Sequence, residues 1–222
     1  MTKKFEKSKS KEHLDKGFLE ELKHKIWSTK GTRFTADNRL KTISKYSTYC
    51  INFLSVYLTI FGLISVYNLY NDIKIAENVM AFAITGFSLL VLVFSIIESS
   101  ENYLLKAKNF HDCALDLSDL YNELQNFKSY NEHVSDDIKK EFCDNLQGRY
   151  QNVLRRYENH HPIDNELFKL KHPDYYETTL YNFVVIKFKY FYYTRLVYLV
   201  LIILPAIYLI YIVSNAMSNT LL

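Results

Sequence analysis

Three histidines and one aspartate are the side chains in this sequence best suited to acid–base or metal chemistry. His160, His161 and His172 each lie within two residues of a proline, and Asp164 follows the first two closely. Imidazole and carboxylate groups transfer protons and bind metal ions near neutral pH. The same residues also cap helices that begin or end at a proline. Capping therefore explains this cluster without catalysis.

Cysteines and glycines give no further sign of an enzyme. Cys50, Cys113 and Cys143 form no C-x-x-C pair, and no glycine-rich phosphate loop or base-activated nucleophile is present. A metal site built from Cys143, His111 and His160 has no ligand spacing to support it. We expect a protein that is not an enzyme, with no metal site and no cofactor.

Three arginines leave two alternatives open. Arg149, Arg155 and Arg156 lie together in one predicted helix and could bind phosphate or nucleic acid. They could equally form a solvated face or ion pairs with Asp144 and Glu158. The second interpretation is the simpler one, and we expect no direct nucleic-acid binding.

Three long uncharged segments divide the sequence into candidate membrane spans and the polar regions that carry these residues. Residues 46–71 and 78–97 contain no charged side chain, and only residues 72–77 separate them. A third uncharged run covers residues 196–222. About 20 apolar residues span a bilayer core of about 30 Å as a helix. We predict an all-α membrane protein with an N-terminal transmembrane helical hairpin, a cytoplasmic antiparallel helical hairpin and a third, C-terminal transmembrane helix.

Small and hydroxylated residues form one stripe on each of the first two spans. Such stripes are typical of helix-packing seams in membranes, but in an oligomer one of them could line a water-filled path. The residues are Asn52, Ser55, Thr59 and Gly62 in the first span, and Ala81, Thr85, Ser88 and Ser95 in the second. Glu98, at the end of the second span, is either a pore-mouth acid or an ordinary charge that ends the span.

Basic residues near the ends of the spans predict the orientation. Residues 1–45 contain thirteen Lys or Arg and six Asp or Glu. Lysines also follow the second span and precede the third. Because cytoplasmic loops are enriched in Lys and Arg, we predict a cytoplasmic N-terminus and an external C-terminus.

Four regions follow from these patterns. Residues 1–45 form a basic arm with an amphipathic helix, whose apolar face binds either anionic lipid or the protein's own helices. We expect Gly31 to end that helix and Thr35 to begin the one that enters the hairpin at 46–97. The predicted cytoplasmic hairpin covers 98–173, and a long helix ending in the third span covers 174–222.

The expected cytoplasmic helices have specific start and stop signals. The helix of the second span is expected to continue past Glu98, and Ser135 is the expected N-cap of the next helix. Asp174 and Glu177 have capping-box spacing at the start of the last helix. We expect Pro205 to kink the third span.

Two segments around the hairpin resemble a known family. They are RFTADNRLKTISKYS, residues 33–47, and YQNVLRRYENHHPIDNELFK, residues 150–169. Together with the short turn between the spans, they resemble the SLATT family, the "SMODS and SLOG-associating two-transmembrane" effector domains of bacterial conflict systems. The second segment is most similar to the subfamily that has an added C-terminal span and occurs beside reverse transcriptases. Its motif residues are Tyr150, Leu154, Glu158, Asn159, His160 and Asp164.

The resemblance implies a function that the residues alone do not. It implies an effector in the bacterial inner membrane that forms a pore. Because three spans are too few to enclose water, we expect a homo-oligomer, whose pore would depolarise the membrane. The trigger would come from a sensor partner, such as a nucleotide-signalling protein or a reverse transcriptase, and the outcome would be abortive infection by phage. The family supplies no catalytic residues. A membrane-anchored scaffold that recruits a soluble partner, and a regulated ion channel, are the alternatives.

Overall fold

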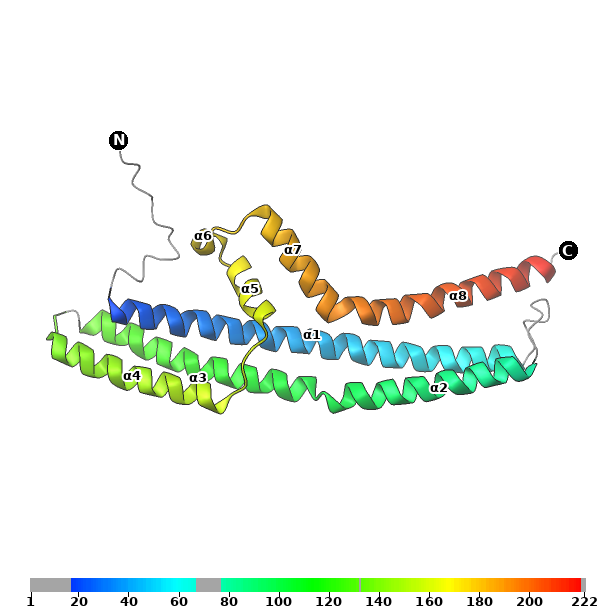
Figure 1. Ribbon diagram of the computed structural model, residues 1–222, viewed down its shortest axis with the longest axis horizontal. Coiled ribbons are helices and arrows are strands. Elements are labelled where there is room, and N and C mark those ends of the chain that lie inside the picture. The colour runs from blue at the N-terminus through cyan, green and yellow to red at the C-terminus, as the bar shows by residue number, and fades with distance from the viewer. Residues whose placement is uncertain (1–16, 67–76, 132, 221–222) are drawn as a thin grey trace, which may run out of the picture. The chain divides into compact units, whose positions relative to one another are not determined.

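The structure is a computed structural model that describes residues 17–66, 77–131 and 133–220. Within these ranges the regular elements are all helical, with no strand (Figure 1). The chain divides into two compact units. We call residues 1–41 with 104–190 the head unit, and residues 42–103 with 191–222 the span unit.

A single helix, α1 (Phe18–Val66), contributes its first part to the head unit and the remainder to the span unit. The predicted break at Gly31 and helix start at Thr35 are therefore wrong. A Cβ added at Gly31 would lie 2.9 Å from Cζ of Phe168 and closer still to two other ring carbons. Glycine costs about 1 kcal/mol relative to alanine inside a helix. At this position it allows an aromatic ring to pack directly on the helix backbone.

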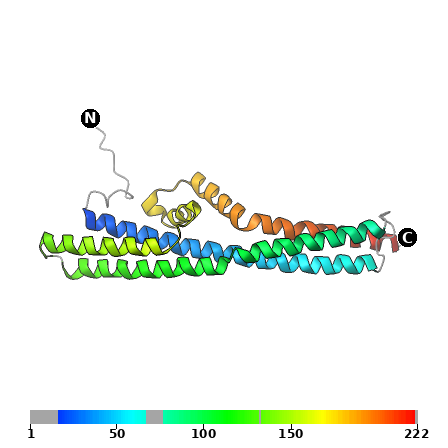
Figure 2. The same ribbon diagram turned by 60° about the horizontal axis from the view of Figure 1, so that its bottom comes forward.

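The core of the head unit is a three-helix bundle of α1, α3 (Tyr103–Tyr130) and α4 (Asp136–Arg156) (Figures 1 and 2). Leu22 and Ile26, on the apolar face of the predicted amphipathic helix, are buried in this core. That face thus packs on the protein's own helices rather than on lipid. The core residues are Leu22, Ile26, Cys113, Leu117, Leu120, Leu124, Leu146, Tyr150 and Val153.

Helices α3 and α4 form the antiparallel helical hairpin that the sequence predicted. The rings of Phe127 and Phe142 stack 3.8 Å apart near the turn, and Arg156 pairs with Asp116 at the other end of the hairpin. Ser135 occupies the N-cap position of α4, as predicted, but its side chain makes no capping hydrogen bond.

The helix of the second span does not continue into α3. Helix α2 (Glu77–Ser100) ends two residues before α3 begins. Asn102 lies between them with φ of 50°, in the left-handed region, where asparagine is among the residues that fit best. The expectation of one uninterrupted helix is wrong, because a left-handed residue ends the helical hydrogen-bond pattern.

Three shorter helices complete the head unit. They are α5 (Pro162–Leu170), α6 (Pro173–Tyr176) and α7 (Leu180–Phe191). The capping box predicted from Asp174 and Glu177 does not form, because α6 ends at Glu177 in a left-handed conformation (φ 47°). The last helix instead starts at Leu180.

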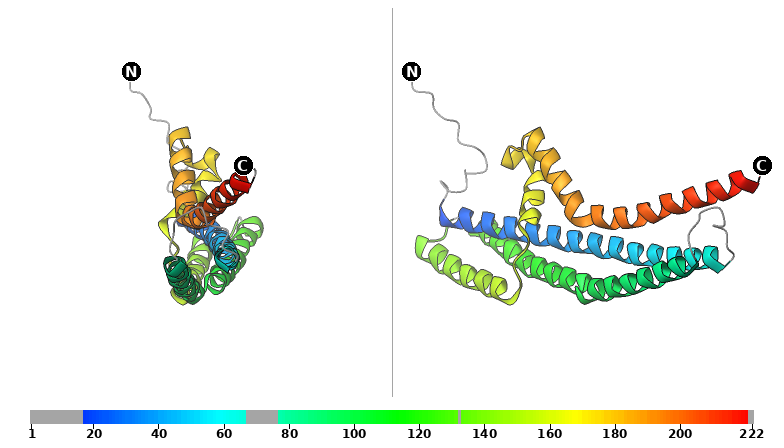
Figure 3. Two further views of the ribbon diagram at one scale, coloured as in Figure 1. Left: turned by 90° about the vertical axis from the view of Figure 1, so that its right-hand side faces the viewer. Right: turned by 45° about the vertical axis from the view of Figure 1, so that its right-hand side comes forward.

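The span unit places the second part of α1 beside α2 and α8 (Val197–Thr220), which follows a five-residue π-helix, Tyr192–Leu196 (Figure 3). Tyr57 donates a hydrogen bond to the carbonyl of Ile202 at 3.0 Å, and the ring of Phe61 lies 5.9 Å from that of Tyr208. Helices α1 and α8 therefore run parallel. The helix continues through Pro205. In the described part of the chain, three helices are long and apolar enough to cross a membrane, so this is a membrane protein.

Candidate functional site

A buried ion pair connects α1 to α5 in the head unit. Nε and Nη2 of Arg39 donate to the two carboxylate oxygens of Asp164 at 2.7 and 3.1 Å. The side chain of Asp164 has no exposed surface. Asp164 also accepts the backbone N–H of His161, whose ring nitrogen accepts the N–H of Ile163, and these two bonds form a capping box at the start of α5. Capping, together with this ion pair, thus accounts for Asp164 and His161.

Arg33 lies on the same helix as Arg39 but has different partners. Its guanidinium donates to the backbone carbonyl of Glu158 and lies over the ring of Phe110, 5.4 Å from the ring centre. The residue is 1% exposed. Among the described residues, no carboxylate forms an ion pair with Arg33, and its Nε has no hydrogen-bond partner. The buried charge of Arg33 therefore lacks the counter-ion that Arg39 has.

The other motif residues lie along the same contact between α4, its C-terminal end and α1. The hydroxyl of Tyr150 is 2.9 Å from that of Thr29. Leu154 packs at the edge of the head core, and Asn159 is exposed. Burial lowers the pKa of His160, and the positive charge of Arg33 lowers it further. The two segments that carry the family resemblance are thus packed against each other.

The structure does not bring Cys143, His111 and His160 together. His111 interacts with Asp37, with 3.3 Å between the ring Nδ1 and the carboxylate, and Lys41 lies 2.8 Å from the same carboxylate. Cys143 is buried elsewhere, in α4. No group of three His, Cys, Asp or Glu residues that could hold a metal ion occurs within the described ranges.

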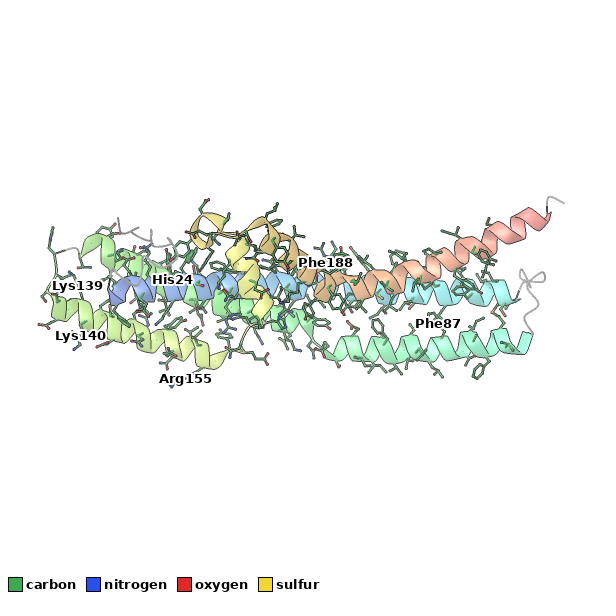
Figure 4. All side chains as sticks on the ribbon, turned by 45° about the horizontal axis from the view of Figure 1, so that its top comes forward. His24, Phe87, Lys139, Lys140, Arg155 and Phe188 are labelled. Carbon is green, nitrogen blue, oxygen red and sulfur yellow. The ribbon has the colours of Figure 1, made fainter. Side chains whose placement is uncertain are left out.

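The arginines of α4 pair mainly with α3. Arg149 bonds Glu123 at 2.7 Å and Arg156 bonds Asp116 at 3.3 Å, so neither pairs with an acid predicted for it. Arg155 projects outward from α4 (Figure 4). The antiparallel register decides these partners, because it places the acids of α3 opposite the arginines.

In the span unit, the polar stripe of α1 faces away from the unit's other helices. Asn52, Ser55 and Thr59 are exposed, whereas Leu54 and Tyr57 on the opposite face are buried. Ser55 and Thr59 donate to backbone carbonyls one turn earlier in α1. The side chain of Asn52 has no hydrogen-bond partner among the described residues. Gly62 has no atom within 4 Å of the position that a Cβ would occupy.

The stripe of α2 lies at the edge of its contact with the other spans. Ala81 and Thr85 are exposed, and Ser88 and Ser95 are half-buried. Glu98 is also half-buried, and its carboxylate accepts a hydrogen bond from the hydroxyl of Tyr198 at 3.0 Å.

An aromatic cluster on α1 is the feature that sequence reasoning missed. The single tryptophan, Trp27, has its ring 4.9 Å from the rings of both Phe168 and His172. The ring of Tyr175 lies 5.5 Å from it, and that of Tyr176 stacks nearly parallel to it. The concentration of aromatic residues between 168 and 176 was the available signal. The cluster holds α5 and α6 against α1.

A family model covers both the head unit and the membrane spans. The SMODS and SLOG-associating 2TM effector domain family 5 matches residues 15–211. The chain belongs to this family. Its description names two transmembrane helices, and α8 adds a third apolar helix that begins within the matched range. Searches of curated proteins and of solved structures found no match. Family membership implies an effector domain of conflict systems.

Proposed function

We propose that this effector oligomerises in the bacterial inner membrane and forms a pore that depolarises the cell. The observation that carries the proposal is the exposed stripe of Asn52, Ser55 and Thr59 on α1. A polar amide facing hydrocarbon costs free energy unless it meets another polar group or water. Contact with a second copy, or with a water-filled path between copies, would provide that partner.

Oligomerisation is a geometric requirement of the proposal. The described part of one chain has three candidate spans, which are too few to enclose a column of water. The inward face of α1 is already used, because Leu54 and Tyr57 pack inside the span unit. The outward stripe is the face of α1 that remains for a neighbouring copy and for water.

The charge distribution supports a cytoplasmic head unit. Lys41 and Lys45 precede the first span, and Lys187 and Lys189 precede the third. Under the positive-inside rule these lysines lie on the cytoplasmic side, which places the N-terminus inside and the C-terminus outside. A cytoplasmic sensor, such as a nucleotide-signalling protein or a reverse transcriptase, would then reach the head unit and trigger the pore, aborting infection.

Membrane potential in cells tests the pore. Induced expression of the wild-type chain should depolarise the inner membrane, as read by a voltage-sensitive dye. Asn52→Leu removes the polar amide at similar size and should suppress depolarisation. Leu90→Ala is the control. Leu90 is exposed on α2 but does not belong to the polar stripe of that helix, and the change adds no polar group.

The same cells separate the pore from the scaffold alternative. Equal expression of all variants in the membrane fraction must be shown first. Growth arrest with an intact membrane potential would reject the pore and favour a scaffold that acts through a soluble partner. Equal depolarisation by wild type and Asn52→Leu would reject the role of the stripe.

A further inference from the structure

The head unit contains a small polar cavity that no part of the pore proposal uses. Its volume is about 270 Å³, just below the range of drug-sized ligand pockets. Lys106, Asn109 and Phe110 line it from α3, and Arg156, Tyr157 and Glu158 line it from the end of α4. Two cations, an amide and two aromatic rings thus surround one space.

The buried Arg33 lies next to this cavity. The two groups that it contacts, the ring of Phe110 and the backbone carbonyl of Glu158, both belong to residues that line the cavity. A buried cation without a counter-ion is strongly unfavourable, and evolved proteins usually pair it. Arg39, six residues further along α1, is paired in this way by Asp164. Arg33 has no such carboxylate among the described residues.

The two acids near the cavity do not pair with Arg33. Asp116 pairs with Arg156 at 3.3 Å and also accepts the hydroxyl of Tyr157 at 3.2 Å. The side chain of Glu158 is exposed, and its bond to Arg33 uses the backbone carbonyl. Neither carboxylate therefore neutralises the buried guanidinium of Arg33. An anion in the cavity would supply the missing counter-ion.

We propose that this cavity binds a phosphate group, which Lys106 and Arg156 contact directly while Arg33 stabilises its charge from behind. Arginine and lysine side chains are the usual phosphate ligands in proteins, and Asn109 adds an amide donor. The group could belong to a soluble phosphate compound or to a lipid headgroup. A lipid headgroup is a candidate because Lys106 follows the end of α2 by only six residues in the sequence. The proposal stands independently of the pore.

Binding to the full chain in nanodiscs tests this proposal and separates the two sources. In discs of neutral phosphatidylcholine, inorganic pyrophosphate is titrated by calorimetry while thermal stability is followed. In a second series, discs contain increasing fractions of phosphatidylglycerol and no soluble phosphate. Saturable binding, or a rise in the unfolding temperature, is expected in at least one series and identifies the source.

Paired charge removals locate the site. Lys106→Gln and Arg156→Gln should each weaken the response about tenfold, the effect of losing one charge-assisted contact. Lys108→Gln and Arg155→Gln are the controls, because they remove the same charges from exposed positions that do not line the cavity. Each control should change the binding response less than twofold. Arg155 projects away from the bundle (Figure 4).

Two outcomes overturn the proposal. The first is no response of the wild-type chain in either series. The second is an equal loss of the binding response in the cavity variants and in their controls, which would indicate diffuse attraction of the anion to a basic surface. Lys106 is half-buried and Arg156 is largely exposed, so neither substitution is expected to prevent folding.

Discussion

Loss of the Asp164 charge is expected to release α5 from α1. In Asp164→Asn, the side chain keeps its size but no longer neutralises Arg39, which is itself mostly buried. Removing one partner of a buried ion pair typically costs about 3–5 kcal/mol, because the other charge remains buried and unpaired. The weaker cap at His161 adds up to about 1 kcal/mol. We therefore expect a loss of about 4 kcal/mol in the free energy of unfolding.

The single tryptophan provides the assay. Trp27 packs on Phe168 of α5, one turn after Asp164, so detachment of α5 exposes the indole ring to water. We expect a red shift of its fluorescence in Asp164→Asn and an unfolding temperature lower by about 8–16 °C, at about 2–4 °C per kcal/mol for a chain of this size. Both are measured on the purified full chain in nanodiscs.

Two further variants make the test specific. Glu166→Gln is the same chemical change on the same helix, but Glu166 is partly exposed and lies 3.7 Å from Lys189, so the expected effect is within about 0.5 kcal/mol. Arg39→Met combined with Asp164→Leu replaces the pair by apolar groups and should recover most of the stability. A loss below about 1 kcal/mol in Asp164→Asn, with unchanged Trp27 emission, would refute this reasoning.

Three further predictions concern the head unit. Gly31→Ala should destabilise it by about 1–3 kcal/mol, despite the better helix propensity of alanine, because the new methyl group meets Phe168; a more stable variant in thermal unfolding would contradict this packing. Burial lowers the pKa of His160, so the folded state binds fewer protons than the unfolded one and stability should fall as pH drops through about 6.5; His160→Gln should flatten that part of the stability–pH curve. Burial raises the pKa of the Cys113 and Cys143 thiols, so both should resist maleimide at pH 7 until the head unit unfolds, and rapid labelling of the native chain would be inconsistent with their burial.

The helices and the hairpin core were predictable because their signals are local. Apolar side chains recur every three to four residues along α3 and α4, and three of them, Leu117, Leu124 and Leu146, are buried. Uncharged runs of about 20 residues identified the spans for the same reason. Each pattern depends only on neighbours along one helix.

The errors arose where distant residues decide the local structure. Gly31 reads as a helix break in isolation, but the ring of Phe168 occupies the space that its missing side chain leaves. Asn102 interrupts a segment whose apolar pattern continues on both sides. Such outcomes depend on tertiary contacts or on a single backbone conformation, which periodicity does not encode.

The candidate site was predicted only in part. The sequence identified His161 and Asp164 as capping residues, and their capping box forms. The pairing of Asp164 with Arg39, and the contrast with Arg33, required the packing of segments more than 120 residues apart in sequence. The polar stripe of α1 was visible as a pattern, but its outward direction was not, because the position of α8 decides which face of α1 is covered.

Conductance of the purified chain is the most direct test of the proposed pore. The purified chain is reconstituted into planar bilayers at increasing protein density, and current is recorded at a fixed voltage. We predict stepwise currents that rise more steeply than protein density, as an oligomer requires, and that are strongly reduced in Asn52→Leu but not in Leu90→Ala. Bilayers that stay electrically silent, although the inserted protein arrests growth when expressed in cells, would contradict the account.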